Sequence, residues 1–270
     1  MTNMDITLPS KKFKHKATIF SVAAIVVTVA CIYINFNPLA IITEFHFIRD
    51  LLAEMFPPNY QSLTENSSTG YAILQTLSMA LLGTLYGGII AILLAFLSAP
   101  NTMPYKFVRL MVQAIVSLIR VMPTLVVVLI FVIAVGPGAF AGMLTLVFTI
   151  IGTFGKLFAD VIENAEQSPG EAIYSVGASR LQVIRYSIVP QILPPLIASL
   201  LYSFDVSMRT AISLGIFGGG GIGFKFQLAK SVLHYKDMTA YISIIIVLVV
   251  LTEKLSDYLR RRILGEGKLR

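Results

Sequence analysis

Long runs of apolar residues, separated by short polar segments, dominate the chain. A membrane-spanning helix needs about 20 apolar residues, and the runs here have about that length. The pattern therefore predicts an all-α, polytopic membrane helical bundle of about six transmembrane helices. The predicted spans cover about 18–36, 71–97, 109–135, 139–158, 191–217 and 238–255.

The polar segments divide the chain. We expect a cytoplasmic tail at 1–17, then an uncleaved first transmembrane helix at 18–36. An external loop at 37–70 is expected to hold a short helix near 41–55. A core domain follows at 71–262 with a polar cytoplasmic loop at 159–190, and a second cytoplasmic tail closes the chain at 263–270.

Composition excludes several other classes. Of the 270 residues, 56% are hydrophobic and only 13% are charged, whereas soluble domains carry roughly 25% charged residues. Intrinsic disorder needs the opposite balance, and six spans leave no room for a large soluble catalytic domain. The single cysteine, Cys31, excludes an internal disulfide.

The distribution of Lys and Arg gives an orientation. With the N-terminus inside, 13 of the 21 Lys and Arg residues fall in cytoplasmic segments and four in external ones. Positive residues favour the cytoplasmic side, so we expect both termini there. The basic residues occur in short runs between apolar segments and do not line one exposed face, which disfavours nucleic-acid binding despite the net charge of +7.

The loop at 159–190 carries the most specific local signals. Ser168 with Glu171, and Ser179 with Gln182, each have the spacing of a capping box. Gly177 suits the left-handed residue that closes a helix. The loop is thus predicted to form two short helices with a sharp bend, suited either to transmitting force to a partner or to a stable connection. Three prolines are expected to end the second helix before the fifth span: Pro190, Pro194 and Pro195.

The same loop resembles the EAA loop of ABC-importer permeases. Glu171, Ala172, Gly177 and Pro190 stand at the spacing of that motif, while Ile173, Ser187 and Val189 depart from it. Within that family the chain looks like the phosphonate-transporter permease over most of residues 55–262. The likeness rests on 56–58, 120–142, 201–209 and 218–223.

The resemblance implies a type I ABC-importer permease fold and a non-catalytic subunit of the bacterial inner membrane. It implies a separate ABC ATPase that holds ATP and Mg and docks on Glu171, Ala172, Gly177, Ser179 and Pro190. An extracytoplasmic binding protein and a second permease copy, forming a homodimer, are the other implied partners. The implied ligand is phosphonate or a related phosphorus oxyanion. The alternative is an ATPase-independent secondary transporter or channel for a small anion.

Three charged residues lie inside predicted spans, away from the span ends. Asp205 and Arg209 are four residues apart and share one helix face, so we expect them to pair. Arg120 is a second intramembrane cation. Charges inside spans face the bundle interior or a water-filled path, so these residues are candidates for the translocation pathway, and the alternative is that they only lock helix packing or snorkel.

A glycine-rich stretch follows the fifth span, and it has no P-loop ending. We expect a flexible or re-entrant break there, with a gating role for Gly218, Gly219, Gly220, Gly221 and Gly223. No cofactor-binding motif is present, and the dispersed His15, His46 and His234 predict no metal site.

Overall fold

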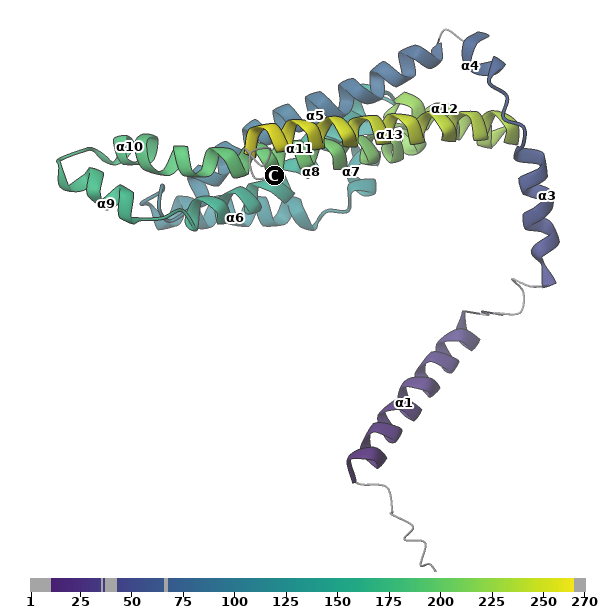
Figure 1. The fold of residues 1–270 in the computed structure, drawn as a ribbon, viewed down its shortest axis with the longest axis horizontal. Helices are drawn as coiled ribbons and strands as arrows, with labels where there is room; N and C mark the ends of the chain where they lie inside the picture. Colours follow the sequence, from purple (N-terminus) through teal and green to yellow (C-terminus); the bar gives the residue numbers. More distant parts are fainter. Residues whose placement is uncertain (1–10, 35, 37–42, 66–67, 265–270) are drawn as a thin grey trace, which may run out of the picture. The chain divides into compact units, whose positions relative to one another are not determined.

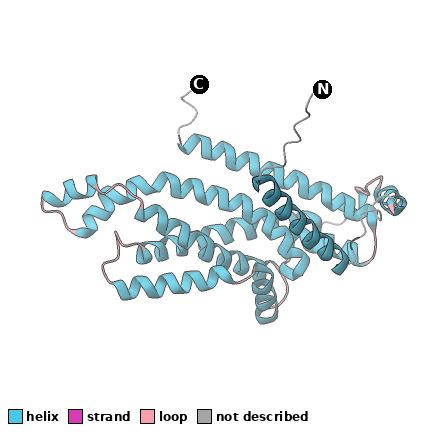
Figure 2. Cartoon of the chain, turned by 90° about the horizontal axis from the view of Figure 1, so that it is seen from below, coloured by secondary structure: helices cyan, strands magenta, loops and turns pink. Residues whose placement is uncertain are grey.

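The computed structural model describes residues 11–34, 36, 43–65 and 68–264, and all its regular elements in those ranges are helices (Figures 1 and 2). The chain divides into two compact units, Met1–Glu54 and Met55–Arg270. This confirms the predicted all-α class.

The first unit holds α1 (Lys11–Tyr33) and α3 (Phe45–Met55). The apolar part of α1, Thr18–Tyr33, is shorter than the spans of the second unit. The short helix expected near 41–55 is α3, which presents Phe45, Phe47, Ile48 and other apolar side chains on its exposed surface. The predicted tail at 1–17 lies largely outside the described residues.

The second unit contains the remaining helices. They are α4 (Gln61–Glu65), α5 (Ser68–Ser98), α6 (Lys106–Val121), α7 (Thr124–Val135), α8 (Ala139–Glu163), α9 (Ser168–Ser175), α10 (Arg180–Val183), the π-helical η1 (Ile184–Ile188), α11 (Val189–Leu214), the π-helical η2 (Gly215–Gly219), α12 (Gly221–Ser231) and α13 (Tyr235–Leu264). Four helices in the described residues are long and apolar enough to cross a membrane, or five if a bent pair counts as one span. The remaining expected span, 18–36, corresponds to α1, whose apolar part is shorter than these helices.

The third predicted span, 109–135, is not one straight helix. It is broken into α6 and α7, which meet at 91°. Met122 is extended, with ψ 124°, because the proline that follows disfavours a helical conformation for the residue before it. Pro123 also lacks the N–H that a continuing helix would use.

The predicted break at the prolines before the fifth span is wrong. A continuous helical stretch runs from Arg180 to Ile216, and the backbone leaves the helical conformation at Phe217 (φ −99°, ψ 20°) and Gly218 (φ +93°). The π-helical η1 lies within it, where Val189 N–H donates to the Ile184 carbonyl. This wide turn places Pro190 in the first turn of α11, where a missing N–H is tolerated. At about 1.5 Å per residue, the helix from Arg180 to Ile216 is roughly 55 Å long, so it extends beyond a hydrocarbon core of about 30 Å.

Small residues allow α5 and α8 to pack closely at the centre of the second unit. A Cβ added to Gly83 would lie 2.6 Å from the Leu146 Cβ, and one added to Gly87 would lie 2.8 Å from the Ile150 Cβ. Such small residues are what helices use to approach each other inside a membrane. A side chain at either position would push α5 away from α8.

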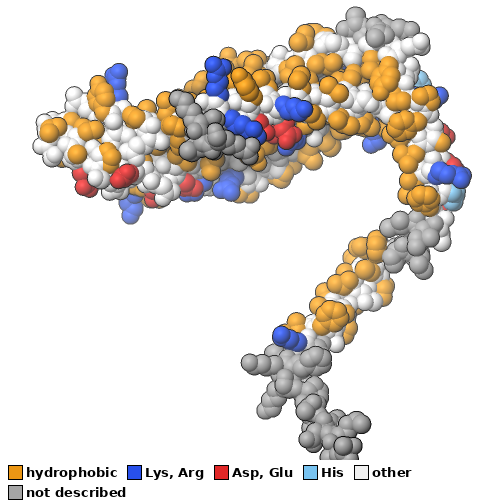
Figure 3. Space-filling model, viewed as in Figure 1, with side chains coloured by type: hydrophobic (Ala, Val, Ile, Leu, Met, Phe, Trp, Pro, Cys, Tyr) orange, Lys and Arg blue, Asp and Glu red, His pale blue; other side chains and the backbone are white. Residues whose placement is uncertain are grey.

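Hydrophobic side chains cover much of the visible surface of the second unit (Figure 3). In the most apolar stretch of each of its four long helices, only 28% to 44% of the residues are buried inside the chain. Apolar faces left exposed in this way are what a bilayer or a further membrane subunit covers. The surface therefore agrees with a membrane location.

Candidate functional site

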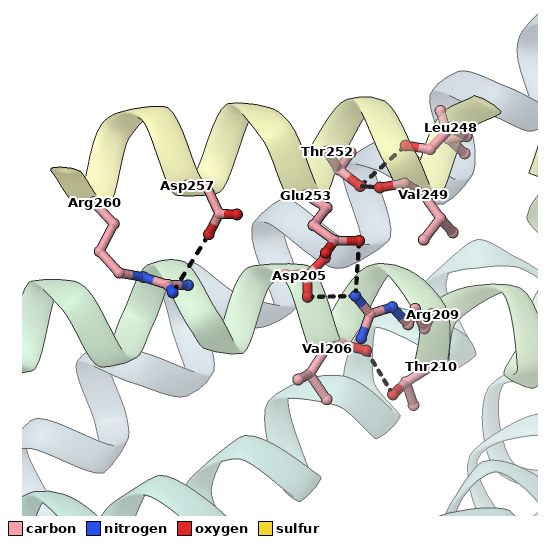
Figure 4. Close-up of polar contacts among 10 residues, drawn as sticks. All are labelled: Asp205, Val206, Arg209, Thr210, Leu248, Val249, Thr252, Glu253, Asp257 and Arg260. Carbon is pink, nitrogen blue, oxygen red and sulfur yellow. Dashed lines mark hydrogen bonds and ion pairs between the residues drawn. The ribbon is translucent and has the colours of Figure 1, made fainter. Parts of the chain in front are cut away.

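Asp205 and Arg209 form the expected pair on α11. The Arg209 Nη2 atom lies 2.8 Å from Asp205 Oδ2 and 3.4 Å from Glu253 Oε2 on α13 (Figure 4). Asp205 is buried, whereas the Arg209 side chain is 49% exposed. The guanidinium therefore bridges two helices and is held by two carboxylates.

The second carboxylate is one that the sequence analysis did not single out. Glu253 lies 44 residues after Arg209, so no helical spacing connects them. Around the pair the α5, α11 and α13 helices bury small hydroxyls. Thr84 donates to the Ser207 hydroxyl at 3.0 Å, and Asp205 Oδ1 and the Ser203 and Ser256 hydroxyls have no partner among the described residues.

Arg120 does not join this pair. It lies in the last turn of α6, beside the bend, and its exposed side chain has no hydrogen bond or ion pair with the residues that the structure describes. Its backbone packs against Gly152 of α8, where an added Cβ would lie 2.8 Å from Arg120 N. The side chain lines a separate cavity of about 510 Å³ between α6, α8, α11 and α13.

The loop at 159–190 folds into the predicted bent pair of helices, α9 and α10. Gly177 has φ +88° and an open space around it, as expected for a left-handed helix end. Gln182 Oε1 accepts from the Ser179 N–H at 2.7 Å, as in the predicted capping box. The box predicted at Ser168 is absent, because Ser168 is already helical and the N-cap is Gln167.

The side-chain amides of Asn101 and Gln191 form hydrogen bonds between this loop and the helix bundle. The Asn101 amide donates to the Ile162 carbonyl at 3.1 Å and the Glu163 carbonyl at 3.0 Å. Gln191 accepts from Glu166 N–H at 2.9 Å and donates to the Ser187 carbonyl at 3.0 Å. Neither residue stood out in the sequence, because each meets backbone groups far along the chain.

The candidate docking residues all face solvent: Glu171, Ala172, Gly177, Ser179 and Pro190. Beside them the tip of the loop exposes apolar side chains, with Val176 84% and Leu181 79% exposed. Beneath the tip, Glu171 and Tyr174 line a cavity of about 390 Å³ with Asn101 and Ser187. The loop is thus hydrogen-bonded to the helix bundle at its base, and its tip is exposed to solvent.

The glycine-rich stretch forms a closely packed corner between α11 and α12. Gly218 has φ +93°, and its carbonyl accepts from Gly138 N–H at 2.8 Å. Gly220 has φ +79°, and an added Cβ would lie 2.5 Å from Ala139 N. The buried members of this corner are Gly219, Gly220, Gly221 and Gly223. The corner fits against the start of α8, so the glycines permit close approach.

Comparison with known proteins agrees with this architecture. The family model described as the binding-protein-dependent transport system inner membrane component matches residues 87–265. Two relatives come from Stutzerimonas stutzeri. The permease protein HtxC, provisionally named for phosphite transport, is 39% identical over 79% of this chain and 74% of its own. The phosphite transport system permease protein PtxC is 30% identical over 87% and 85%.

A solved structure shows the same fold. It is the bacterial alginate ABC transporter in complex with an alginate pentasaccharide-bound periplasmic protein, with a TM-score of 0.65 and 17% identity over 94% of this chain and 98% of that chain. The family and the apolar helices place the protein in the bacterial inner membrane. Together with the long match to the family model, the fold shows that the chain belongs to the family of binding-protein-dependent transport system inner membrane components.

Proposed function

We propose that the chain is the transmembrane permease subunit of an ATP-driven ABC importer for phosphonate or a related phosphorus oxyanion, phosphite or phosphate. One observation carries the proposal: relatives named for phosphite transport align with this chain over most of both lengths. The intramembrane cations support an anionic ligand, since guanidinium groups bind phosphorus oxyanions well.

Energy for transport is proposed to come from a separate ABC ATPase, on which ATP and Mg bind. The ATPase would dock on the exposed tip of α9 and α10, through Glu171, Ala172, Gly177 and Ser179, and on Pro190 at the start of α11. The hydrogen bonds of Asn101 and Gln191 support this role. Gln191 joins the segment before α9 to α11, and Asn101 joins the end of α8 to the segment between α5 and α6, so force on the tip would reach these helices. ATP binding would then pull the loop inward and turn the pathway outward.

The other partners of the proposal are an extracytoplasmic binding protein that delivers the ligand and a second copy of this chain, giving a homodimeric pathway. The complex of the alginate transporter with its periplasmic protein supports the first of these. In this arrangement the N-terminus and the α9–α10 tip are cytoplasmic, and the glycine-rich corner lies at the external end of α11, where it would take part in gating.

Arg120, Asp205 and Arg209 are proposed to line the pathway. One guanidinium, that of Arg209, faces two carboxylates, so an anion would be held only weakly beside it. Weak binding would suit a conduction path, which needs sites that release their ligand.

The deciding experiment is uptake by the permease reconstituted in vesicles with its ATPase and binding protein. Labelled phosphite, phosphate and methylphosphonate are offered with ATP, with a non-hydrolysable ATP analogue, and without nucleotide. We expect uptake of at least one oxyanion only with hydrolysable ATP. Uptake by the permease alone would support the secondary-transporter alternative, and no uptake of any oxyanion would reject the proposed ligand class.

A further inference from the structure

The cavity beside Arg120 is lined by cationic side chains from three helices. Arg120 comes from α6, Lys156 from α8 and Arg260 from α13, and Asp160 is the only carboxylate in the lining. Its volume of about 510 Å³ falls within the roughly 300–1,000 Å³ of small-molecule sites. No sequence spacing relates these three cations, because they are far apart along the chain.

The positive charges of the cavity are only partly compensated. Lys156 lies 2.8 Å from Asp160, and Arg260 lies 3.4 Å from Asp257. Arg120 has no such partner among the described residues. The three cations therefore have two carboxylate partners, Asp160 and Asp257, whereas the single cation Arg209 has two carboxylate partners of its own.

A hydroxyl donor completes the cavity. The Thr153 and Ser199 hydroxyls donate to carbonyls of their own helices, at 2.8 Å each. Tyr202 lines the same cavity, and its hydroxyl has no hydrogen bond within the described part of the chain. Guanidinium, ammonium and phenol donors around one space are the groups that bind an oxyanion.

The cavity lies along the same helix pair as the Arg209 site. The α11 and α13 helices run antiparallel, with Arg209 beside Glu253 (Figure 4). Tyr202 of α11 and Arg260 of α13 line one cavity. Tyr202 precedes Arg209 by seven residues and Arg260 follows Glu253 by seven. Seven residues are two turns, so the cavity lies about 10.5 Å from the Arg209 site, toward the end of α11 that carries α9 and α10.

We propose that this cavity is a second binding site for a phosphorus oxyanion, two turns nearer the α9–α10 end than Arg209, with Arg120 and Arg260 as its principal ligands. The inference rests on the proposed function and deepens it. The ligand would leave the screened Arg209 site for a more positive one before release. Rings of Arg and Lys serve anion and phosphate pores in this way.

An anionic lipid headgroup offers the same chemistry, since basic pockets between membrane helices also bind lipid phosphates. The test therefore separates the two sources.

The experiment is equilibrium dialysis of the assembled transporter, without nucleotide, against labelled orthophosphate, phosphite and methylphosphonate. It is done in detergent without lipid and again in nanodiscs of neutral lipid with or without cardiolipin. We compare the wild type with Arg120→Gln, Arg260→Gln and the double variant. Arg261→Gln is the matched control, because this exposed residue is next in sequence and does not line the cavity.

We expect each single variant to bind the free oxyanion about tenfold more weakly, since each loses charge-assisted hydrogen bonds, and Arg261→Gln to bind as the wild type does. Equal binding by the double variant and the wild type would overturn the proposal. The proposal would also be overturned if cardiolipin bound and none of the three oxyanions displaced it, or if none of the three oxyanions bound at all. Because the measurement needs no ATP, it can fail while uptake succeeds, which keeps it distinct from the test of transport.

Discussion

Arg209 illustrates that a charged side chain in a membrane helix requires partners of opposite charge. An unpaired charge at that depth is costly, and the arginine meets Asp205 one turn away and Glu253 on the neighbouring helix. The first contact was predictable from the spacing of four residues, because such residues share a helix face. The second was not, because it depends on how α13 packs on α11.

Replacing Arg209 with lysine tests whether its planar group matters. Lysine keeps the charge, and one ammonium could meet both carboxylates as Arg209 Nη2 does, but lysine lacks the planar donors that bind an oxyanion bidentately. We expect Arg209→Lys to lower ATP-dependent oxyanion uptake about tenfold, equivalent to about 1.4 kcal/mol in the barrier. The measurement is the initial uptake rate in reconstituted vesicles, normalised to the amount of assembled transporter.

Arg261→Lys is the control for that change, since Arg261 is exposed and has no ion pair among the described residues. If Arg209→Lys transports at the rate of this control, the arginine serves packing alone.

At the scale of the element, the bent α9–α10 pair depends on one backbone conformation. Gly177 has φ +88°, and nothing lies within 4 Å of an added Cβ. A substitution there is therefore strained by its backbone and does not clash with a neighbour. Residues differ in how well they adopt this left-handed region, since Asn tolerates it and β-branched residues do not.

We expect Gly177→Val to weaken association of the ATPase about tenfold, because valine in this conformation costs about 1–2 kcal/mol and shifts the bend between the helices. Gly177→Asn should retain nearly full association. The measurement is the amount of ATPase that copurifies with each permease variant at graded ATPase concentrations. Equal loss in both variants would point to a contact made by the glycine itself, and no loss in either would argue against docking at this bend.

At the scale of the whole molecule, orientation is the property that most needs a direct test. Positive-residue bias predicts a cytoplasmic N-terminus, and the same orientation puts the α9–α10 tip inside and the start of α13 outside. The chain has one native cysteine, Cys31, so a Cys31→Ser background permits single-cysteine labelling.

In that background we expect Val176→Cys to react with a membrane-impermeant maleimide only after the membrane is opened. His234→Cys should react from outside intact spheroplasts. Both native residues are exposed, which makes the positions accessible. Labelling of Val176→Cys in sealed spheroplasts would reverse the proposed orientation and remove the ATPase from that face.

Chain pattern alone determined the helical class, most of the span positions, the left-handed Gly177 and the Asp205–Arg209 pair, because each depends on local periodicity or on residues within one helical turn. It could not determine the 91° bend at Met122 and Pro123 or the continuity of α10 into α11. A proline can end a helix, bend it or be accommodated within it, and the surrounding packing selects among these outcomes. The partners Glu253, Asn101 and Gln191, and the meeting of Arg120 with Arg260, were decided only by tertiary structure, because helix packing brings together residues that no sequence spacing relates.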